Sequence, residues 1–288
     1  MPSVRSRLLL LGPACAILVA LLVLPLGYLL RFSLYRAVPG RMTVEPGATL
    51  ANYAKIFLDP FYRGVLLDTV WLSVLTTAIT LLAGFPLAYF LWRAPARWKG
   101  PLTILVVAPL LISIVVRTYG WMVILGDNGV VNVLLRAVGL IREPITMMFT
   151  QFAVVVGLTH VQLPFMVLSI LAALERIDPA MSEAAETLGA SRWRTVRHVI
   201  LPLAAPGVAA GTTLVFSLSI SAFVTPALMG GSGTRVLTTL IYQQFVTVFN
   251  WPFGAAVAAV LLAVALGIIF IYLRALARRG GGLLQAGA

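Results

Sequence analysis

The sequence predicts an all-α membrane protein with six transmembrane helices. Of its 288 residues, 60% are hydrophobic and only 10% are charged, whereas a soluble domain carries about 25% charged residues. Six apolar blocks reach about 20 residues, the length that a helix needs to cross a bilayer, and none alternates like a membrane β-barrel strand. A soluble enzyme, a disordered chain and a disulfide scaffold are therefore excluded.

The six predicted spans are predominantly apolar. They are Leu8–Leu30, Val65–Trp92, Pro101–Leu125, Thr150–Leu174, Pro206–Met229 and Gly254–Leu273. We interpret the first as an uncleaved helix, because its apolar core is longer than that of a signal peptide and no small-x-small cleavage site follows. Between the third and fourth spans, Val130–Val138 is predicted to be a short helix, since Gly129 and Gly139 flank an apolar stretch.

Basic residues indicate the orientation. With the N-terminus inside, the inner segments hold twelve Lys and Arg residues and the outer segments hold eight. Because cytoplasmic loops are enriched in Lys and Arg, both termini are expected in the cytoplasm. The net charge of +12 would suggest nucleic acid in a soluble protein. Here the basic residues lie between apolar blocks, so we expect contact with membrane lipid and none with nucleic acid.

The inner segment 175–205 is the most charged part of the chain. Asp178 followed by Pro179 is a typical helix start, which predicts a helix over Pro179–Leu188 that ends at a left-handed Gly189. Ser191 is expected to cap a second helix that runs toward Pro202. On residue chemistry alone, a docking surface for a cytoplasmic partner and a solvated loop touching anionic lipid are equally good interpretations.

The same segment carries a specific pattern. Glu183-Ala184-Ala185, then three residues, Gly189, nine residues, Val199, one residue and Leu201-Pro202 resembles the EAA loop of bacterial ABC importer permeases, which usually have Ile at the position of Val199. Further segments resemble the spermidine/putrescine permeases among them, and the similarity runs from about Leu26 to Leu273. These segments are Leu50-Ala51-Asn52-Tyr53, Leu163-Pro164-Phe165-Met166, Met229-Gly230-Gly231 and Trp251-Pro252-Phe253-Gly254.

The resemblance implies a type I ABC importer permease fold, multi-pass in the bacterial inner membrane. It implies three partners: a cytoplasmic ABC ATPase dimer that binds ATP and Mg, a second permease subunit that is a paralogue, and a periplasmic substrate-binding protein. It divides the chain into a first helix with a long periplasmic loop (1–64), a five-helix core that includes the EAA coupling loop 175–205 (65–273), and a cytoplasmic tail (274–288). The residues implied to couple to the ATPase are Glu183, Ala184, Ala185, Glu186, Gly189 and Arg192.

The sequence independently favours a transport subunit that is not an enzyme. There is no G-x4-G-K-[ST] loop to hold ATP phosphates, and neither HExxH nor GxSxG occurs. We therefore expect no catalytic residue, no metal site and no cofactor bound by this chain. A polyamine or similar small organic cation is the predicted cargo, with an opine or aminophosphonate as alternatives. An ion-gradient-driven carrier would need buried acids, and Asp68 is the one acid inside a predicted span.

Polar groups within the spans are the candidates for the substrate pathway. They are Asp68, Trp71, Arg117, Tyr119, Gln162, Ser217 and Ser221. Each has a structural alternative. Asp68 and Trp71 could simply lie side by side at the depth of the lipid headgroups. Arg117 could extend its side chain to the outer membrane interface. Gln162, with nearby His160, fits a hydrogen bond between helices.

Ser217 and Ser221 belong to a stripe of hydroxyls that steps by four along the fifth span, from Thr213 to Thr225. Lining of the pathway and bonding to the backbone one turn back explain such a stripe equally well. No acid lies at the centre of any span, so we expect the binding protein to supply most of the selectivity.

Overall fold

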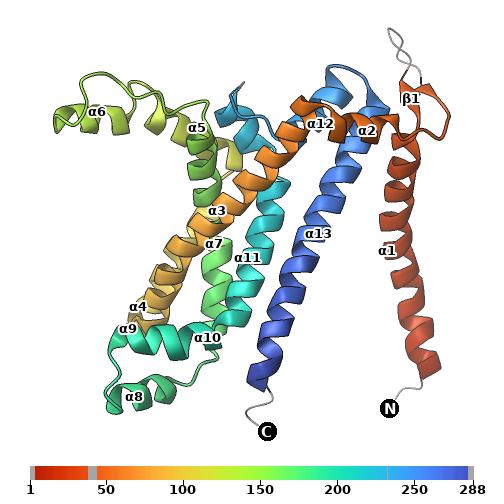
Figure 1. Cartoon of the computed structure of the whole chain (residues 1–288). Helices are drawn as coiled ribbons and strands as arrows, with labels where there is room; N and C mark the ends of the chain where they lie inside the picture. The colour runs from red at the N-terminus through yellow and green to blue at the C-terminus, as the bar shows by residue number, and fades with distance from the viewer. Residues whose placement is uncertain (1–3, 38–43, 232, 285–288) are drawn as a thin grey trace. The chain divides into compact units, whose positions relative to one another are not determined.

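A computed structural model of the chain describes residues 4–37, 44–231 and 233–284, which are almost entirely helical (Figure 1). The four helices long and apolar enough to cross a membrane unaided are α1 (Val4–Ser33), α3 (Pro60–Arg93), α7 (Gln151–Leu174) and α13 (Trp251–Leu284). The shorter helices are α2 (Ala51–Leu58), α4 (Ala96–Val107), α5 (Ile114–Leu125), α6 (Val130–Ala137), α8 (Pro179–Thr187), α9 (Arg192–Thr195), α10 (Leu201–Leu203), α11 (Ala205–Ile220) and α12 (Leu237–Val246).

Three tighter or wider helical turns and one pair of short strands complete the described elements. They are the 3₁₀ turn η1 (Ala108–Leu111), the π turns η2 (Val196–Ile200) and η3 (Pro226–Gly230), and the strands β1 (Arg36–Ala37) and β2 (Val44–Glu45). The chain divides into two compact units: Met1–Gly64 with Leu237–Val264, and Val65–Val236 with Ala265–Ala288. The predicted division at residues 64 and 273 stays a prediction, and its tail ends outside the described residues.

In the first unit, polar contacts hold the end of α1 against α2. The Asn52 side chain donates to the carbonyl oxygens of Ser33 and Tyr35 at 2.7 and 3.0 Å, and the hydroxyls of Tyr53 and Ser33 lie 2.6 Å apart. The strands pair antiparallel, with Arg36 opposite Glu45. Asn52 thus satisfies backbone carbonyls at the end of α1 and just beyond it, while Tyr53 contacts the side chain of Ser33.

The Trp251-Pro252-Phe253-Gly254 segment starts α13 and packs against α12. The Trp251 indole donates to the carbonyl of Phe245 at 3.1 Å, and a Cβ at Gly254 would lie 2.9 Å from the Phe245 ring. The Phe253 ring meets that of Tyr62 at a centroid distance of 4.9 Å. Glycine at 254 therefore permits the close approach of α12.

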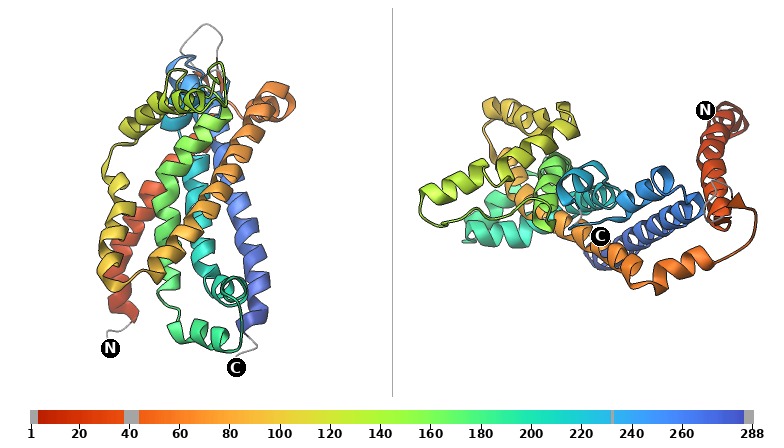
Figure 2. Two further views of the ribbon diagram at one scale, coloured as in Figure 1. Left: turned by 90° about the vertical axis from the view of Figure 1, so that its left-hand side faces the viewer. Right: turned by 90° about the horizontal axis from the view of Figure 1, so that it is seen from above.

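The second unit is organised around α7 and α11, which lie side by side (Figure 2). A Cβ at Gly207 would lie 2.4 Å from that of Ala173, and one at Gly211 would lie 2.8 Å from the sulfur of Met166. Small residues thus let the two backbones approach closely, as is usual between membrane helices. Met166 also lies 2.8 Å from a Cβ built on Gly84 of α3, so one side chain fills the space between three helices.

The prediction of an all-α membrane protein is confirmed, but two of the six spans are not continuous helices. Six spans result only when each of two bent pairs counts as one: Ala96–Leu111 with Ile114–Ala137, bent by 95°, and Arg192–Leu203 with Ala205–Ile220, bent by 69°. The expectation of one helix over Pro101–Leu125 was wrong. Pro109 tightens the chain into η1, Ile112 is extended, and the Ser113 side chain accepts from the amide of Val115 to start α5.

The expectation of one helix over Pro206–Met229 was also wrong. The helix α11 ends at Ile220, and the chain turns before Pro226 starts the wide turn η3. The predicted hydroxyl stripe is therefore interrupted. Thr213 and Ser217 lie on α11, whereas Thr225 is buried beyond its end, with its hydroxyl 3.4 Å from that of Thr118.

Candidate functional site: the charged loop between α7 and α11

The helix α8 is built by local signals at both of its ends. The Asp178 carboxylate accepts from the amide of Ala180 at 2.9 Å, and Pro179 occupies the first turn. At the other end Gly189 has a φ of +84°. The amides of Gly189 and Ala190 donate to the carbonyls of Glu186 and Ala185, each at 3.0 Å. These two bonds form a Schellman cap, which requires the left-handed residue that glycine provides at least cost.

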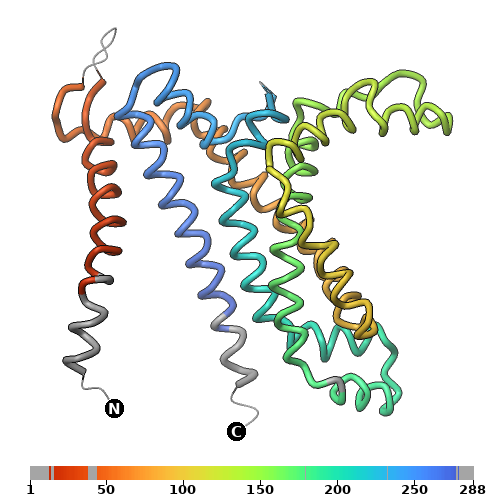
Figure 3. Tube along the Cα trace, turned by 180° about the vertical axis from the view of Figure 1, so that it is seen from behind, coloured from red at the N-terminus to blue at the C-terminus, as the bar shows by residue number. Residues whose placement is uncertain are grey.

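The second helix of the loop is less regular than expected. Ser191 occupies the N-cap position of α9 but makes no side-chain cap bond. The chain continues through η2 and α10 to Leu203, and the bend of 69° before α11 follows. Seen in Figure 3, α8 and α9 extend beyond the ends of α7 and α11. We call the segment 178–203 the knuckle.

One ion pair joins the knuckle to the end of α3. Arg93 Nη2 lies 3.5 Å from Glu186 Oε1, and each side chain is 42% exposed. Arg93 also donates from Nε to the hydroxyl of Tyr89 at 3.2 Å and lies 5.4 Å from the centre of the Trp92 ring. An open groove of about 490 Å³ runs along this contact. It is lined by Tyr89, Phe90, Arg93, Glu186, Arg192, Trp193 and Val196.

The residues predicted to couple to an ATPase lie together on the surface of the knuckle. Glu183, Ala184, Glu186, Gly189 and Arg192 are exposed, and Ala185 is partly exposed.

Three large apolar side chains of the knuckle are also exposed and were missed from the sequence. Leu188 is 88% exposed, Trp193 73% and Met181 50%. Apolar side chains within the most charged segment were the available signal. Exposed apolar groups rimmed by charges are typical of a protein-binding surface.

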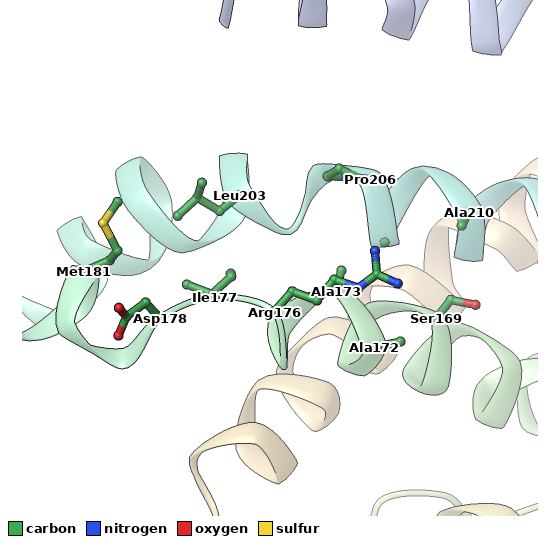
Figure 4. Close-up of a pocket in the computed structure, with 11 residues that line it drawn as sticks. Ser169, Ala172, Ala173, Arg176, Ile177, Asp178, Met181, Leu203, Pro206 and Ala210 are labelled. Carbon is green, nitrogen blue, oxygen red and sulfur yellow. The ribbon is translucent and has the colours of Figure 1, made fainter. Parts of the chain in front are cut away.

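A second cavity, of about 540 Å³, opens where α7 ends and α11 begins (Figure 4). Small residues line its walls: Ser169, Ala172, Ala173, Gly207 and Ala210. Arg176 directs its guanidinium toward the first turn of α11, while Asp178 lies near Met181 of the knuckle. The cavity therefore lies between the knuckle and the adjoining ends of α7 and α11.

The predicted pathway residues are spread over four helices. Trp71 on α3 and Tyr119 on α5 are 56% and 54% exposed, and Asp68 is partly buried. Gln162 on α7 is buried, and its Oε1 accepts from the Ser219 hydroxyl on α11 at 2.8 Å. In this structure Gln162 thus makes the hydrogen bond between helices.

Ser217 on α11 and Ser221 just after its end bond to backbone carbonyls one turn back, which is the alternative to lining a pathway. Ser217 donates to the carbonyl of Thr213 at 2.7 Å, and Ser221 donates to that of Ser217 at 2.8 Å. Ser217 is partly exposed and Ser221 is exposed. Their assignment to a pathway stays a prediction, as do those of the other residues named for it.

Residues 46–280 match the family model of the binding-protein-dependent transport system inner membrane component. The chain therefore belongs to this family of permeases. It is a transmembrane permease subunit of an ABC importer, a transport protein and not an enzyme, as the EAA-like pattern predicted.

Curated relatives match most of the chain. The spermidine/putrescine transport system permease protein PotB of Escherichia coli (strain K12) is 37% identical over 227 residues, which cover 79% of this chain and 82% of the relative. The protein of the same name in Haemophilus influenzae is 36% identical over 227 residues, or 79% of each chain. The inner membrane ABC transporter permease protein YdcU of Escherichia coli is 34% identical over 245 residues, covering 80% of this chain and 77% of that one.

A solved structure has the same fold. A chain of a bacterial ABC transporter that imports the acidic polysaccharide alginate superposes with a TM-score of 0.75 and 22% identity, covering 96% of each chain. This likeness confirms the permease fold.

Proposed function

We propose that this chain is a permease subunit of an ATP-driven, binding-protein-dependent importer of polyamines or a similar small organic cation. The observation that carries the proposal is the knuckle, a capped helix with exposed acidic and apolar side chains beyond the ends of α7 and α11. Family membership supplies the class of transporter. The relatives named as spermidine/putrescine permeases support the cargo.

In this proposal a cytoplasmic ATPase dimer, which holds the ATP and Mg, binds the knuckle. Glu183, Glu186 and Arg192 supply charge, and Leu188 supplies apolar contact area. When the two ATPase subunits bind ATP and close, they displace α8, and the ion pair between Glu186 and Arg93 transmits this movement to α3. Each state must be favoured by contacts that differ between the two conformations.

The knuckle then defines the cytoplasmic side of the inner membrane. Within the second unit, the described end of α13 lies at the same end as α8, opposite α6 (Figure 1). This placement supports a cytoplasmic C-terminus, and the distribution of basic residues supports both termini in the cytoplasm. A periplasmic binding protein and a second permease, paralogous to this one, complete the importer, and lipid surrounds the spans.

The experiment is reconstitution of the importer in nanodiscs with its ATPase, second permease and binding protein. We expect putrescine or spermidine on the binding protein to stimulate ATP hydrolysis, and opines and aminophosphonates to have little effect. Stimulation by another cargo would replace the polyamine assignment, and failure of any ABC ATPase to co-purify with the chain would contradict the proposal as a whole.

A variant tests the role of the knuckle in the same assay. Glu183→Lys should abolish stimulation by the liganded binding protein while the chain still folds and inserts. The control is Glu143→Lys, which makes the same change of charge at an exposed site outside the knuckle. Equal stimulation in the two variants would show that Glu183 is not part of the coupling surface.

A further inference from the structure

A cationic side chain without a partner lies inside the second unit. Arg117 is in the first turn of α5, and its Nε and Nη1 are buried without a hydrogen-bond partner within the described part of the chain. One turn further along α5, the Trp121 ring packs edge-on against His160 of α7 at 5.6 Å. The Nδ1 of His160 is buried and also lacks a partner among the described residues. A buried charge is costly unless it is paired.

The site lies well below the end of the helices. Arg117 precedes the end of α5 at Leu125 by eight residues, or about 12 Å at 1.5 Å per residue. His160 follows the start of α7 at Gln151 by nine residues, or about 13 Å. Because α7 is long enough to cross the bilayer by itself, the depth of His160 along α7 places the site in the hydrocarbon region, away from lipid phosphates.

This chain offers no acid to pair with Arg117. None of its nine carboxylates belongs to α5, α7 or α11, and Asp68 on α3 bonds neither buried nitrogen. A cationic cargo would be repelled. A carboxylate on another chain would supply the missing counter-charge.

The face of α5 beside Arg117 suits a helix of such a chain. Val116, Tyr119 and Val123 are 61%, 54% and 71% exposed, and a Cβ built on Gly120 meets nothing within 4 Å. A small residue beside an apolar stripe lets another membrane helix approach closely. Arg117 is only partly buried, and its long side chain would have to change rotamer to present its nitrogens to this face.

We propose that Arg117 is a subunit-docking residue that binds an Asp or Glu carboxylate from a membrane helix of the second permease subunit, which packs on the α5 face at Gly120. The inference rests on the proposed function, because it requires that second permease. It adds a defined contact surface and the chemical class of the residue that must face it.

The test compares Arg117→Met in the isolated chain and in the importer. In the isolated chain, replacing an unpaired buried cation with an apolar side chain should leave the Tm unchanged or raise it. In the importer, it should weaken retention of the second permease at least about tenfold, because the partner carboxylate is left unpaired. Arg117→Lys should restore part of this retention, and Arg142→Met, at an exposed site, should leave it unchanged.

Each Asp or Glu of the second permease should then be neutralised in turn. At one position, neutralisation should weaken retention of the second permease as much as Arg117→Met does, and combining the two changes should weaken it no further. Unchanged retention in Arg117→Met, or a lower Tm of the isolated variant, would overturn the inference. Full retention combined with a higher cargo concentration for half-maximal uptake would assign Arg117 to an anionic group of the cargo and overturn it as well. If the unmodified chain retains neither a second permease nor an ATPase, the proposed function itself has failed.

Discussion

Arg93 and Glu186 lie 93 residues apart in the sequence, and their side chains meet at 3.5 Å. Arg93 is the last residue of α3, and Glu186 lies in the last turn of α8. The pair connects a long span directly to the charged helix outside it. In the proposed cycle, this contact makes α8 and α3 move together.

The first prediction concerns this ion pair. Because both side chains are 42% exposed, loss of the pair in Arg93→Gln should lower the free energy of unfolding by no more than about 1 kcal/mol. Cargo-stimulated ATP hydrolysis should fall by no more than about fivefold, which is the change that about 1 kcal/mol of lost coupling produces. Arg93→Lys, which keeps the positive charge beside Glu186, should lose less than Arg93→Gln, whereas Arg97→Gln, at an exposed site on α4, should match the unmodified chain.

The second prediction concerns the backbone at Gly189. A Cβ there meets nothing within 4 Å, so only the φ of +84° opposes a side chain. Gly189→Ala should therefore destabilise the α8 cap by about 1 kcal/mol, and Gly189→Asn by less, since Asn tolerates this conformation. Stimulation of ATP hydrolysis should be highest with Gly at position 189, lower with Asn and lowest with Ala. Gly100→Ala on α4, where the backbone is helical and the space is open, is the control, and an equal effect there would contradict the argument.

The third prediction concerns Leu188. Because its side chain is 88% exposed, Leu188→Ser should leave the Tm of the isolated chain unchanged. Affinity for the ATPase should fall roughly 10- to 100-fold, because burial of a leucine side chain contributes about 1.5–3 kcal/mol and each step of about 1.4 kcal/mol is a factor of ten. Binding is measured by titrating the ATPase onto the chain in nanodiscs. Leu174→Ser should behave in the opposite way and lower the Tm, since Leu174 is fully buried.

The fourth prediction concerns the contact between α7 and α11. A Cβ at Gly207 would lie 2.4 Å from the Cβ of Ala173 and 2.8 Å from the carbonyl oxygen of Ser169. Gly207→Ala should therefore cost roughly 1–3 kcal/mol, because backbone atoms must shift to admit the methyl group. Thermal unfolding measures the loss. Gly267→Ala on α13, where nothing lies within 4 Å, should be neutral or stabilising.

The fifth prediction concerns the cargo. Asp68 is a partly buried carboxylate on α3, one turn from the exposed ring of Trp71. If this pair attracts an ammonium group, Asp68→Asn should raise the cargo concentration for half-maximal uptake about three- to tenfold. Asp127→Asn, at an exposed site after α5, is the control. Uptake kinetics that do not change in Asp68→Asn would remove this residue from the pathway.

The sequence determined those features that depend on neighbouring residues. The lengths of the apolar segments predicted the long helices. The Asp-Pro start and the glycine after the last turn predicted the bounds of α8 to within one residue, because caps and backbone conformation depend on neighbouring residues. The short helix α6 followed in the same way from the glycines beside it. The EAA-like pattern was readable because its spacing lies within one loop.

Only the tertiary structure decided which distant groups meet. Gln162 forms a hydrogen bond with Ser219, Asn52 donates to the carbonyl of Ser33, and Arg93 pairs with Glu186. The residues of each pair are far apart in the sequence, and no sequence pattern indicates that they meet. The breaks at Ile112 and after Ile220 were hidden because the residues around them stay apolar, so hydropathy continues where the helix does not. In lipid, a backbone that leaves the helix needs partners from neighbouring segments, and those segments are known only once the helices are packed.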